Sequence, residues 1–299
     1  MKNRIAAFMN SLSRPFSLEI FPPKKEHQKA FEFVLRTIEA LCPTNPSFIS
    51  VTYGAGGSNK GKVVQISHEV LERGILPLSH LTAVGFSKED VRLVLDQLHE
   101  AGVRAILALR GDIPKGVTYP DGAWKDFHLA IDLIRLVRED GRFCVGAATY
   151  PEGHPTHRDP DRSVEHFAIK ASAGADFFIS QMFFDNSCFY RFVDTVRKRG
   201  LSHPIIPGIM PLVKKIQIQK ILELSGAMIP KTLLESIERY QDDPESFCQA
   251  GIDFATQQVL MLRDQGIPNV HLYTMNQPDP ILKILTQASL LDEKEIHNG

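Results

Sequence analysis

The fold is decided by residues 75–112, which read ILPLSHLTAVGFSKEDVRLVLDQLHEAGVRAILALRGD. Apolar runs occupy 75–84 and 105–112, and between them residues 87–102 repeat apolar side chains with the 3.6-residue period of a helix. This middle segment begins with a serine followed three residues later by an acid, which is a capping-box pattern, and it ends at Gly102, suited to a left-handed C-cap. The stretch therefore predicts a strand, a helix and a second strand of a parallel sheet.

The same alternation continues through the whole chain. Several of the apolar runs are apolar almost throughout, as expected of parallel strands that are covered on both faces. The eight runs are 16–21, 48–54, 75–84, 105–112, 143–150, 177–184, 204–210 and 270–276. The glycines Gly74, Gly102, Gly141, Gly174 and Gly200 each stand just before a run, where a helix ends. Eight strand–helix units in 299 residues favour an α/β fold of the closed (β/α)8 type, a TIM barrel, over a doubly wound open sheet.

The longest connection joins the seventh and eighth runs. It contains three further candidate helices, at 213–225, 231–240 and 245–265. No linker or composition change divides the chain, so we predict one catalytic barrel domain over 1–299 with extra helices between strands seven and eight.

Composition excludes several classes of function. The net charge of −1 offers no electrostatic footprint for nucleic acid or an anionic membrane surface. No run approaches the roughly 18 apolar residues that a membrane span needs, and the N-terminal 16 residues are too interrupted for a signal peptide. The four cysteines form no C-x-x-C pair, which predicts a reduced, cytoplasmic protein.

A barrel of this kind carries its active site at the carboxyl ends of the strands. Nearly all of these ends are polar here. The most unusual is SLEIFPPK (17–24), in which Glu19 stands in an apolar strand that two prolines terminate. A buried carboxylate is costly unless it is paired or neutral. Glu19 is therefore either half of a structural ion pair, with Arg110 as partner, or a proton donor at the rim of a site.

Other strand-end residues also have two interpretations. GAGGS (54–58) looks like a phosphate-binding loop, but it is neither a G-x-G-x-x-G nor a Walker A sequence, and such a stretch is more often a flexible turn into a helix. Gln181 could be a satisfied core amide, and Asp112 the cap of a turn. A further group of side chains could suggest a metal site, but a His-x-x-His on a proline-rich loop is poorly specified, so no metal is predicted. These residues are His154, His157, Asp159 and Asp161.

Two barrel chemistries do not fit these strand ends. The first run lacks the His-x-His of metal-dependent barrel hydrolases, and no run contains a lysine that could form a Schiff base. Because no nucleophile is evident, the polar inventory suits an organic cofactor that carries the reaction while the protein supplies orientation and one proton.

Eight motifs then resemble, in order and spacing, those of the bacterial methylenetetrahydrofolate reductases, over residues 14–277. They are SLEIFPPK, FISVTYGAGGS, SHLTAVG, LALRGD, ATYPEGHP, FFISQMFFD, PIIPGIMP and VHLYTMN. The resemblance implies a barrel that binds FAD across its strand ends. NADH or NADPH would reduce the flavin and leave. Hydride from flavin N5 would then convert 5,10-methylenetetrahydrofolate to 5-methyltetrahydrofolate, the methyl source for methionine synthesis.

The resemblance also implies roles for individual residues. Glu19 would be the general acid, Asp112 would tune the flavin potential, and Gln181 would bind the pterin and the nicotinamide. The residues implied around FAD are Thr52, Tyr53, Ala55, His80, Arg110, Gly111, Asp112, Tyr150, His154 and Lys170. The residues implied on the folate and nicotinamide side are Glu19, Gln181, Gln217 and Tyr273. A homo-oligomer is expected, as is the absence of a C-terminal regulatory domain.

Several positions depart from the family pattern. Ile221 and Gln277 stand where some relatives have a phenylalanine and an arginine on the folate side. Ser163, His166 and Ile169 replace polar contacts to the adenosine half of FAD. Two other functions remain open at this point: a flavin barrel with another substrate, as in proline dehydrogenase-like enzymes, and a non-catalytic folate- or flavin-binding protein.

Overall fold

The computed structural model describes residues 2–23, 28–53, 60–111, 125–156, 158–216, 218 and 225–291. Its strands are all parallel to their neighbours and form one sheet. They are β1 (Phe16–Ile20), β2 (Ile49–Val51), β3 (Pro77–Thr82), β4 (Ala105–Leu109), β5 (Cys144–Thr149), β6 (Phe177–Ser180), β7 (Ile205–Ile206), β8 (Gly208–Ile209) and β9 (Val270–Tyr273). Each of the eight predicted runs contains strand, and the seventh contains two short ones.

The seventh run completes the ring. The strand order is β7-β6-β5-β4-β3-β2-β1-β9-β8, so the two ends of the sheet are β7 and β8, which only Pro207 separates along the chain. Proline has no N–H to donate to a ladder, which explains the interruption. Its carbonyl accepts from His271 N at 2.8 Å, and β7 pairs with β6 while β8 pairs with β9. The (β/α)8 barrel prediction is confirmed.

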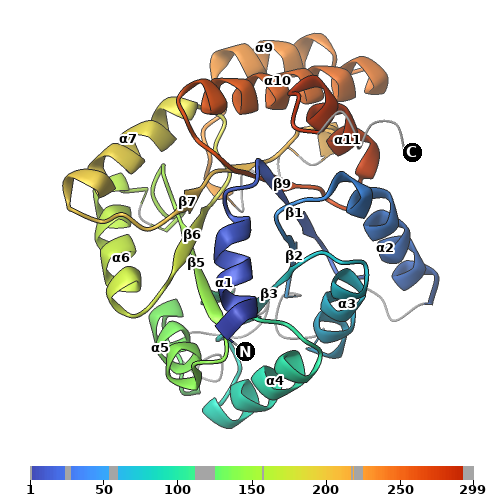
Figure 1. Cartoon of the computed structure of the whole chain (residues 1–299). Coiled ribbons are helices and arrows are strands. Elements are labelled where there is room, and N and C mark those ends of the chain that lie inside the picture. The colour runs from blue at the N-terminus through green and yellow to red at the C-terminus, as the bar shows by residue number, and fades with distance from the viewer. Residues whose placement is uncertain are drawn as a thin grey trace.

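Helices surround the sheet (Figure 1). They are α1 (Lys2–Ser11), α2 (Gln28–Leu41), α3 (Lys60–Glu72), α4 (Lys88–Glu100), α5 (Ala130–Asp140), α6 (Pro160–Ser172), α7 (Asn186–Lys198), α9 (Lys231–Arg239), α10 (Pro244–Asp264) and α11 (Pro278–Gln287), with a 3-10 turn, η1 (Cys42–Thr44), after α2. The predicted capping box of α4 is present, since Ser87 Oγ accepts from Asp90 N and the Asp90 carboxylate accepts from Ser87 N.

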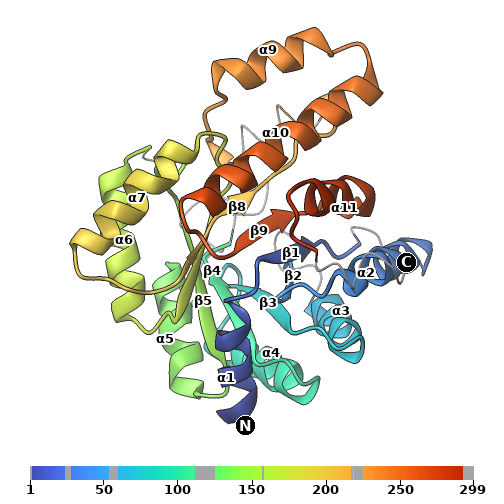
Figure 2. The same cartoon turned by 45° about the horizontal axis from the view of Figure 1, so that its top comes forward.

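The extra helices between the last strands are confirmed as α9 and α10, and α9 lies farthest from the barrel (Figure 2). The third predicted helix, at 213–225, lies mostly outside the described residues. Within the described part of the chain, no helix is long and apolar enough to cross a membrane.

Alternation along the strands separates two buried layers. Leu18, Ile20 and other outward residues join the large core between sheet and helices. A second, interior cluster contains inward residues near the strand starts, among them Phe48 and Phe177, together with Phe8 of α1. The Phe8 ring centroid lies 5.2 Å from that of Phe48 and 5.5 Å from that of Phe177. Helix α1, which the sequence analysis did not predict, therefore closes the amino end of the barrel (Figure 1).

Candidate active site

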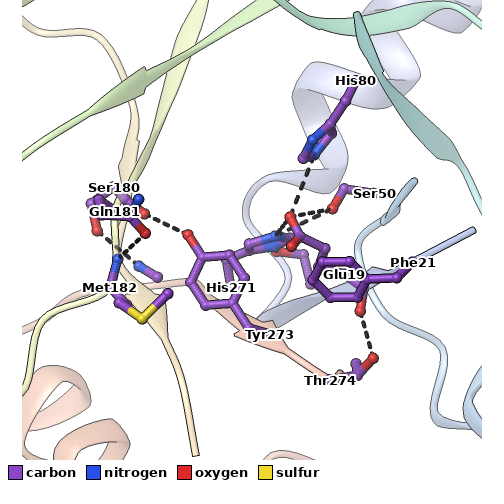
Figure 3. A network of polar contacts seen from close by, with 12 residues as sticks. Glu19, Phe21, Ser50, His80, Ser180, Gln181, Met182, His271, Tyr273 and Thr274 are labelled. Carbon is purple, nitrogen blue, oxygen red and sulfur yellow. Dashed lines mark hydrogen bonds and ion pairs between the residues drawn. The ribbon is translucent and has the colours of Figure 1, made fainter. Parts of the chain in front are cut away.

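Glu19 lies on the inward face of β1 and is only 6% exposed. Its Oε2 is 3.4 Å from His80 Nε2 and 3.6 Å from His271 Nε2, and it accepts a hydrogen bond from Ser50 Oγ at 3.3 Å. All three side chains point toward the carboxylate (Figure 3). The carboxylate of Glu19 therefore faces two histidines and a serine in the described structure, in place of the ion pair with Arg110 that the sequence allowed.

His80, on β3, is a neutral neighbour of this carboxylate. Burial lowers the pKa of His80 to about 4; the Glu19 carboxylate opposes this shift and the His271 ring adds to it. Its buried Nε2 has no hydrogen-bond partner of good geometry among the residues described. A neutral ring here can exchange a hydrogen bond with a bound molecule but brings no positive charge to Glu19 at pH 7.

His271, on β9, lies beneath Glu19 and is fully buried. Its Nδ1 is 2.8 Å from Ser17 Oγ and its Nε2 is 3.3 Å from Ser50 Oγ. Strand register explains these contacts, because Ser17 pairs with His271 across β1 and β9, and Glu19 pairs with Ser50 across β1 and β2. Three strands thus bring two serines, a histidine and a glutamate into one continuous chain of polar groups.

The backbone that carries Glu19 is held by residues that follow the neighbouring strand β9. Thr274 Oγ1 donates to Glu19 O at 2.6 Å. The side-chain amide of Asn276 bonds to both backbone groups of Phe21, accepting from its N at 2.9 Å and donating to its O at 2.8 Å. The strand therefore ends in a fixed position despite having no further sheet partner.

Gln181 and Tyr273 line the same barrel mouth. Gln181 Oε1 accepts from Met182 N at 3.0 Å and the residue is half-buried, so it is not a fully enclosed core amide. The Tyr273 hydroxyl donates to Ser180 O at 2.9 Å (Figure 3). Gly208 makes room for this contact, since a Cβ there would lie 2.6 Å from the Tyr273 hydroxyl oxygen. Burial, helped by the Glu19 charge, raises the pKa of Tyr273, so the phenol stays protonated.

Unpartnered polar atoms mark the ends of β2 and β3. Tyr53 Oη and Thr82 Oγ1 are buried and have no hydrogen-bond partner in the part of the chain that the structure describes. Buried polar groups are seldom left unpaired, because each costs roughly 1–3 kcal/mol. Such atoms indicate a place for a polar ligand.

Gly111 follows β4 beside Thr82. Its φ is +85°, and a Cβ would lie 2.6 Å from Val84 Cγ1 and 3.0 Å from Thr82 Cβ. Only glycine fits this conformation and this space, so the backbone stays open toward the strand ends.

Two cations stand near each other at the ends of β4 and β5. Lys170 of α6 donates to Ala148 O at 2.8 Å, and its ammonium lies 5.8 Å from the Tyr150 ring centroid. Burial and, to a smaller extent, the nearby Arg110 charge together lower the pKa of Lys170 to about 8. Adjacent like charges are favourable when an anion neutralises both, and a diphosphate has that charge. Together with the orphaned hydroxyls and Gly111, these residues fit FAD.

The remaining predicted residues divide into two groups. Thr52 lies at the same strand ends, as do Tyr150 and His154, whose rings meet edge to face with centroids 4.7 Å apart. Three predicted site residues lie outside the described residues: Ala55, Asp112 and Gln217. His157 and Ile221 also lie outside them.

The structure also locates several residues that differ from the family pattern and part of the possible metal site. Ser163 is buried, Ile169 is 50% exposed, and Gln277 is the N-terminal cap residue of α11. Asp159 caps α6 by accepting from Asp161 N and Arg162 N. Over the described ranges, no three His, Cys, Asp or Glu side chains are grouped so as to hold a metal ion.

The sequence analysis missed Ser17, Ser50 and His271. A usable signal was present: each lies two residues before an inward strand-end residue, namely Glu19, Thr52 and Tyr273. Alternation therefore places them on the same inward face.

Comparisons with known proteins agree with this geometry. The family model described as methylenetetrahydrofolate reductase matches residues 4–289. Methylenetetrahydrofolate reductase 1 of Schizosaccharomyces pombe is 34% identical over 287 residues, covering 93% of this chain and 46% of the yeast protein. The 5,10-methylenetetrahydrofolate reductase of Pectobacterium carotovorum is 32% identical over 264 residues, covering 88% of this chain and 86% of that one. The chain thus spans less than half of its yeast relative but most of the bacterial one.

A solved structure supports the fold independently. An uncharacterized Clostridium thermocellum protein, which binds two copies of 5-methyl-5,6,7,8-tetrahydrofolic acid, superposes with a TM-score of 0.65 at 13% identity. The superposition covers 97% of this chain and 98% of that protein. At this identity the likeness shows a shared barrel and no more. The match along almost the whole sequence goes further and confirms the resemblance noted from the motifs: the chain belongs to the methylenetetrahydrofolate reductase family.

Proposed function

We propose that this protein reduces 5,10-methylenetetrahydrofolate to 5-methyltetrahydrofolate, with FAD as cofactor and NADH or NADPH as electron donor. The observation that carries the proposal is Glu19, a buried carboxylate at a barrel mouth, in a chain of this family. A protein that only binds folate or flavin has no need of such a group.

The residues that would hold FAD are those with unused polar atoms or charge at the strand ends. Lys170 and Arg110 would bind its diphosphate, Gly111 would allow close approach of the backbone, and Tyr53 and Thr82 would find hydrogen-bond partners. When bound, FAD supplies hydride transfer between the nicotinamide and the folate.

Glu19 would supply the proton. Opening the methylene bridge of the substrate leaves an amine that must be protonated, and a general acid placed beside it serves this purpose. Burial shields Glu19 from solvent, and the contacts of Thr274 and Asn276 with the backbone on either side of it fix its direction.

Gln181 and Tyr273 would orient the substrate. The Gln181 amide nitrogen is left for a pterin or nicotinamide group, because its oxygen is turned back to Met182 N. The Tyr273 hydroxyl already donates to Ser180, so its ring position is set before substrate arrives. Preorganisation of this kind reduces the conformational entropy that the side chain loses when substrate binds.

An anaerobic spectrum of the FAD-supplemented protein tests the proposal. NADH or NADPH should bleach the flavin absorbance, and 5,10-methylenetetrahydrofolate added afterwards should restore it. Bleaching without recovery would assign the barrel another substrate, and absence of bound flavin would support a binding protein. Sedimentation of the same sample would test the expected homo-oligomer.

A further inference from the structure

The polar chain beneath Glu19 connects the carboxylate to a second titratable side chain, His271, which the general-acid role does not require. It runs from Val270 O to Ser17 Oγ, His271, Ser50 Oγ and Glu19 Oε2, with successive distances of 3.4, 2.8, 3.3 and 3.3 Å. Ser17 Oγ can donate a hydrogen bond to the carbonyl oxygen of Val270, which can only accept one. With the Ser17 proton directed there, the same oxygen accepts from His271 Nδ1, which leaves Nε2 as the titratable end of the ring.

Two arrangements of one proton then satisfy every group. In the first, Glu19 is a carboxylic acid that donates to Ser50, Ser50 donates to His271 Nε2, and the imidazole is neutral. In the second, His271 is an imidazolium that donates to Ser50, and Ser50 donates to the Glu19 carboxylate. Moving one proton across each of these two hydrogen bonds converts one arrangement into the other, and the net charge of the pair stays zero.

The other ionisable groups facing the pair do not compete for this proton. His80 from β3 is neutral because burial lowers its pKa to about 4, and Tyr273 from β9 stays protonated because burial raises its pKa. The His271 ring is covered by Phe48, with centroids 5.6 Å apart, and by the edge of Tyr273 at 5.4 Å. Its polar contacts are thus limited to the two serines and Glu19 among the described side chains.

We propose that His271 shares the catalytic proton with Glu19 through the Ser50 hydroxyl, so that Glu19 and His271 act as one proton-holding pair. This inference rests on the proposed function, which consumes one proton per turnover: NAD(P)H, one proton and the methylene folate become NAD(P)+ and the methyl folate. His271 touches no substrate in this scheme and is a positioning residue for the proton, while Glu19 remains the group that delivers it.

The first test compares pH profiles of the folate half-reaction, measured as flavin reoxidation, in wild type and in His271→Gln. Two sites that can both bind the same proton release it at a higher pH than one of the sites alone. The high-pH fall in rate should therefore move to lower pH in the variant, by about 0.3 pH unit for an equally shared proton and by more when the imidazole holds most of it. No shift, or a shift to higher pH, overturns the proposal. Flavin reduction by NAD(P)H should be unchanged.

Ser50 gives a milder variant. Ser50→Ala should slow flavin reoxidation by folate by about tenfold or more, while Ser50→Thr, which keeps the hydroxyl, should restore it. Ser47→Ala is the matched control, since Ser47 is equally buried near the other end of β2 and donates to Phe16 O. An equal loss in Ser50→Ala and Ser47→Ala would assign Ser50 a structural role.

An infrared measurement on the purified full chain needs neither flavin turnover nor folate. The carboxylic C=O band that disappears in Glu19→Gln should titrate at higher pH in wild type than in His271→Gln. Identical titrations overturn the shared proton even where the enzyme is active. Conversely, a wild type that does not reduce folate refutes the proposed function and leaves this result intact.

Discussion

The two ends of the barrel interior are built on opposite principles. At the amino end, the Phe8 ring of α1 packs against those of Phe48 and Phe177 in an apolar cluster. At the carboxyl end, Glu19 and His80 share the interior with hydroxyls that have no partner in the described structure. One end contributes stability, and the other keeps costly polar atoms unpaired for a ligand. Substitutions at the amino end should therefore change mainly the stability of the protein, and substitutions at the carboxyl end should change mainly its reaction.

The largest expected effect is at the carboxyl end. Glu19→Gln should slow flavin reoxidation by methylenetetrahydrofolate by about 10²–10⁴-fold, because the amide cannot act as an acid. Flavin reduction by NAD(P)H and the unfolding midpoint should stay close to wild type. Glu32→Gln, at a side chain 43% exposed on α2, is the control. Full folate turnover in Glu19→Gln would remove Glu19 from the mechanism.

The amino end should respond in stability instead. Phe8→Ala removes a ring that is 1% exposed and should lower the free energy of unfolding in urea by about 3–5 kcal/mol. The half-reactions of the folded fraction should remain. Phe33→Ala removes a ring that is 53% exposed and should cost under about 0.5 kcal/mol. If Phe8→Ala were as mild as the control, α1 would not seal the barrel.

An intermediate effect is expected at Gly111, where the backbone would approach FAD in the proposed function. Gly111→Ala meets both left-handed strain and a Cβ contact of 2.6 Å with Val84, whereas Gly74→Ala meets the strain alone, at φ +80° with nothing within 4 Å. Both should lose roughly 1–2 kcal/mol of stability from the strain. Only Gly111→Ala should in addition weaken FAD binding, measured by quenching of flavin fluorescence. Equal FAD affinity in the two variants would place the cofactor away from Gly111.

The smallest effect is a pH dependence of FAD binding. Because the pKa of Lys170 is lowered to about 8, its ammonium is charged below that pH and neutral above it. FAD affinity should therefore fall as pH rises through 8, by up to about tenfold between pH 7 and 9. Lys170→Met should bind weakly with no such slope, and Lys198→Met, at an exposed lysine of α7, should keep the wild-type slope. A flat wild-type titration would contradict the diphosphate role of Lys170.

Much of the fold was predictable because its signals are local. The capping box at Ser87 and the left-handed glycines at helix ends were found as expected. The split of the seventh strand at Pro207 and the seal formed by α1 were not predicted. Both depend on closure of the ring. The strand is divided at Pro207 because the residues on its two sides pair with different neighbouring strands, and α1 is buried only because the ring leaves an apolar opening.

Some residues of the candidate site could likewise be recognised from the sequence, and others could not. Glu19 was recognisable from its own sequence neighbourhood, since an acid in an apolar strand that ends in two prolines is chemically unusual. Serine and histidine within apolar strands carry no comparable signal, so Ser17, Ser50 and His271 were overlooked.

By itself, the sequence determined the family, the barrel, and which polar side chains stand at the strand ends. Only the tertiary structure decided that Ser17 faces His271 across 254 positions of chain and that Ser50 reaches both His271 and Glu19. The reason is physical. Periodicity and caps act over a few residues, whereas contacts between strands depend on parallel register and closure of the ring, to which every strand contributes.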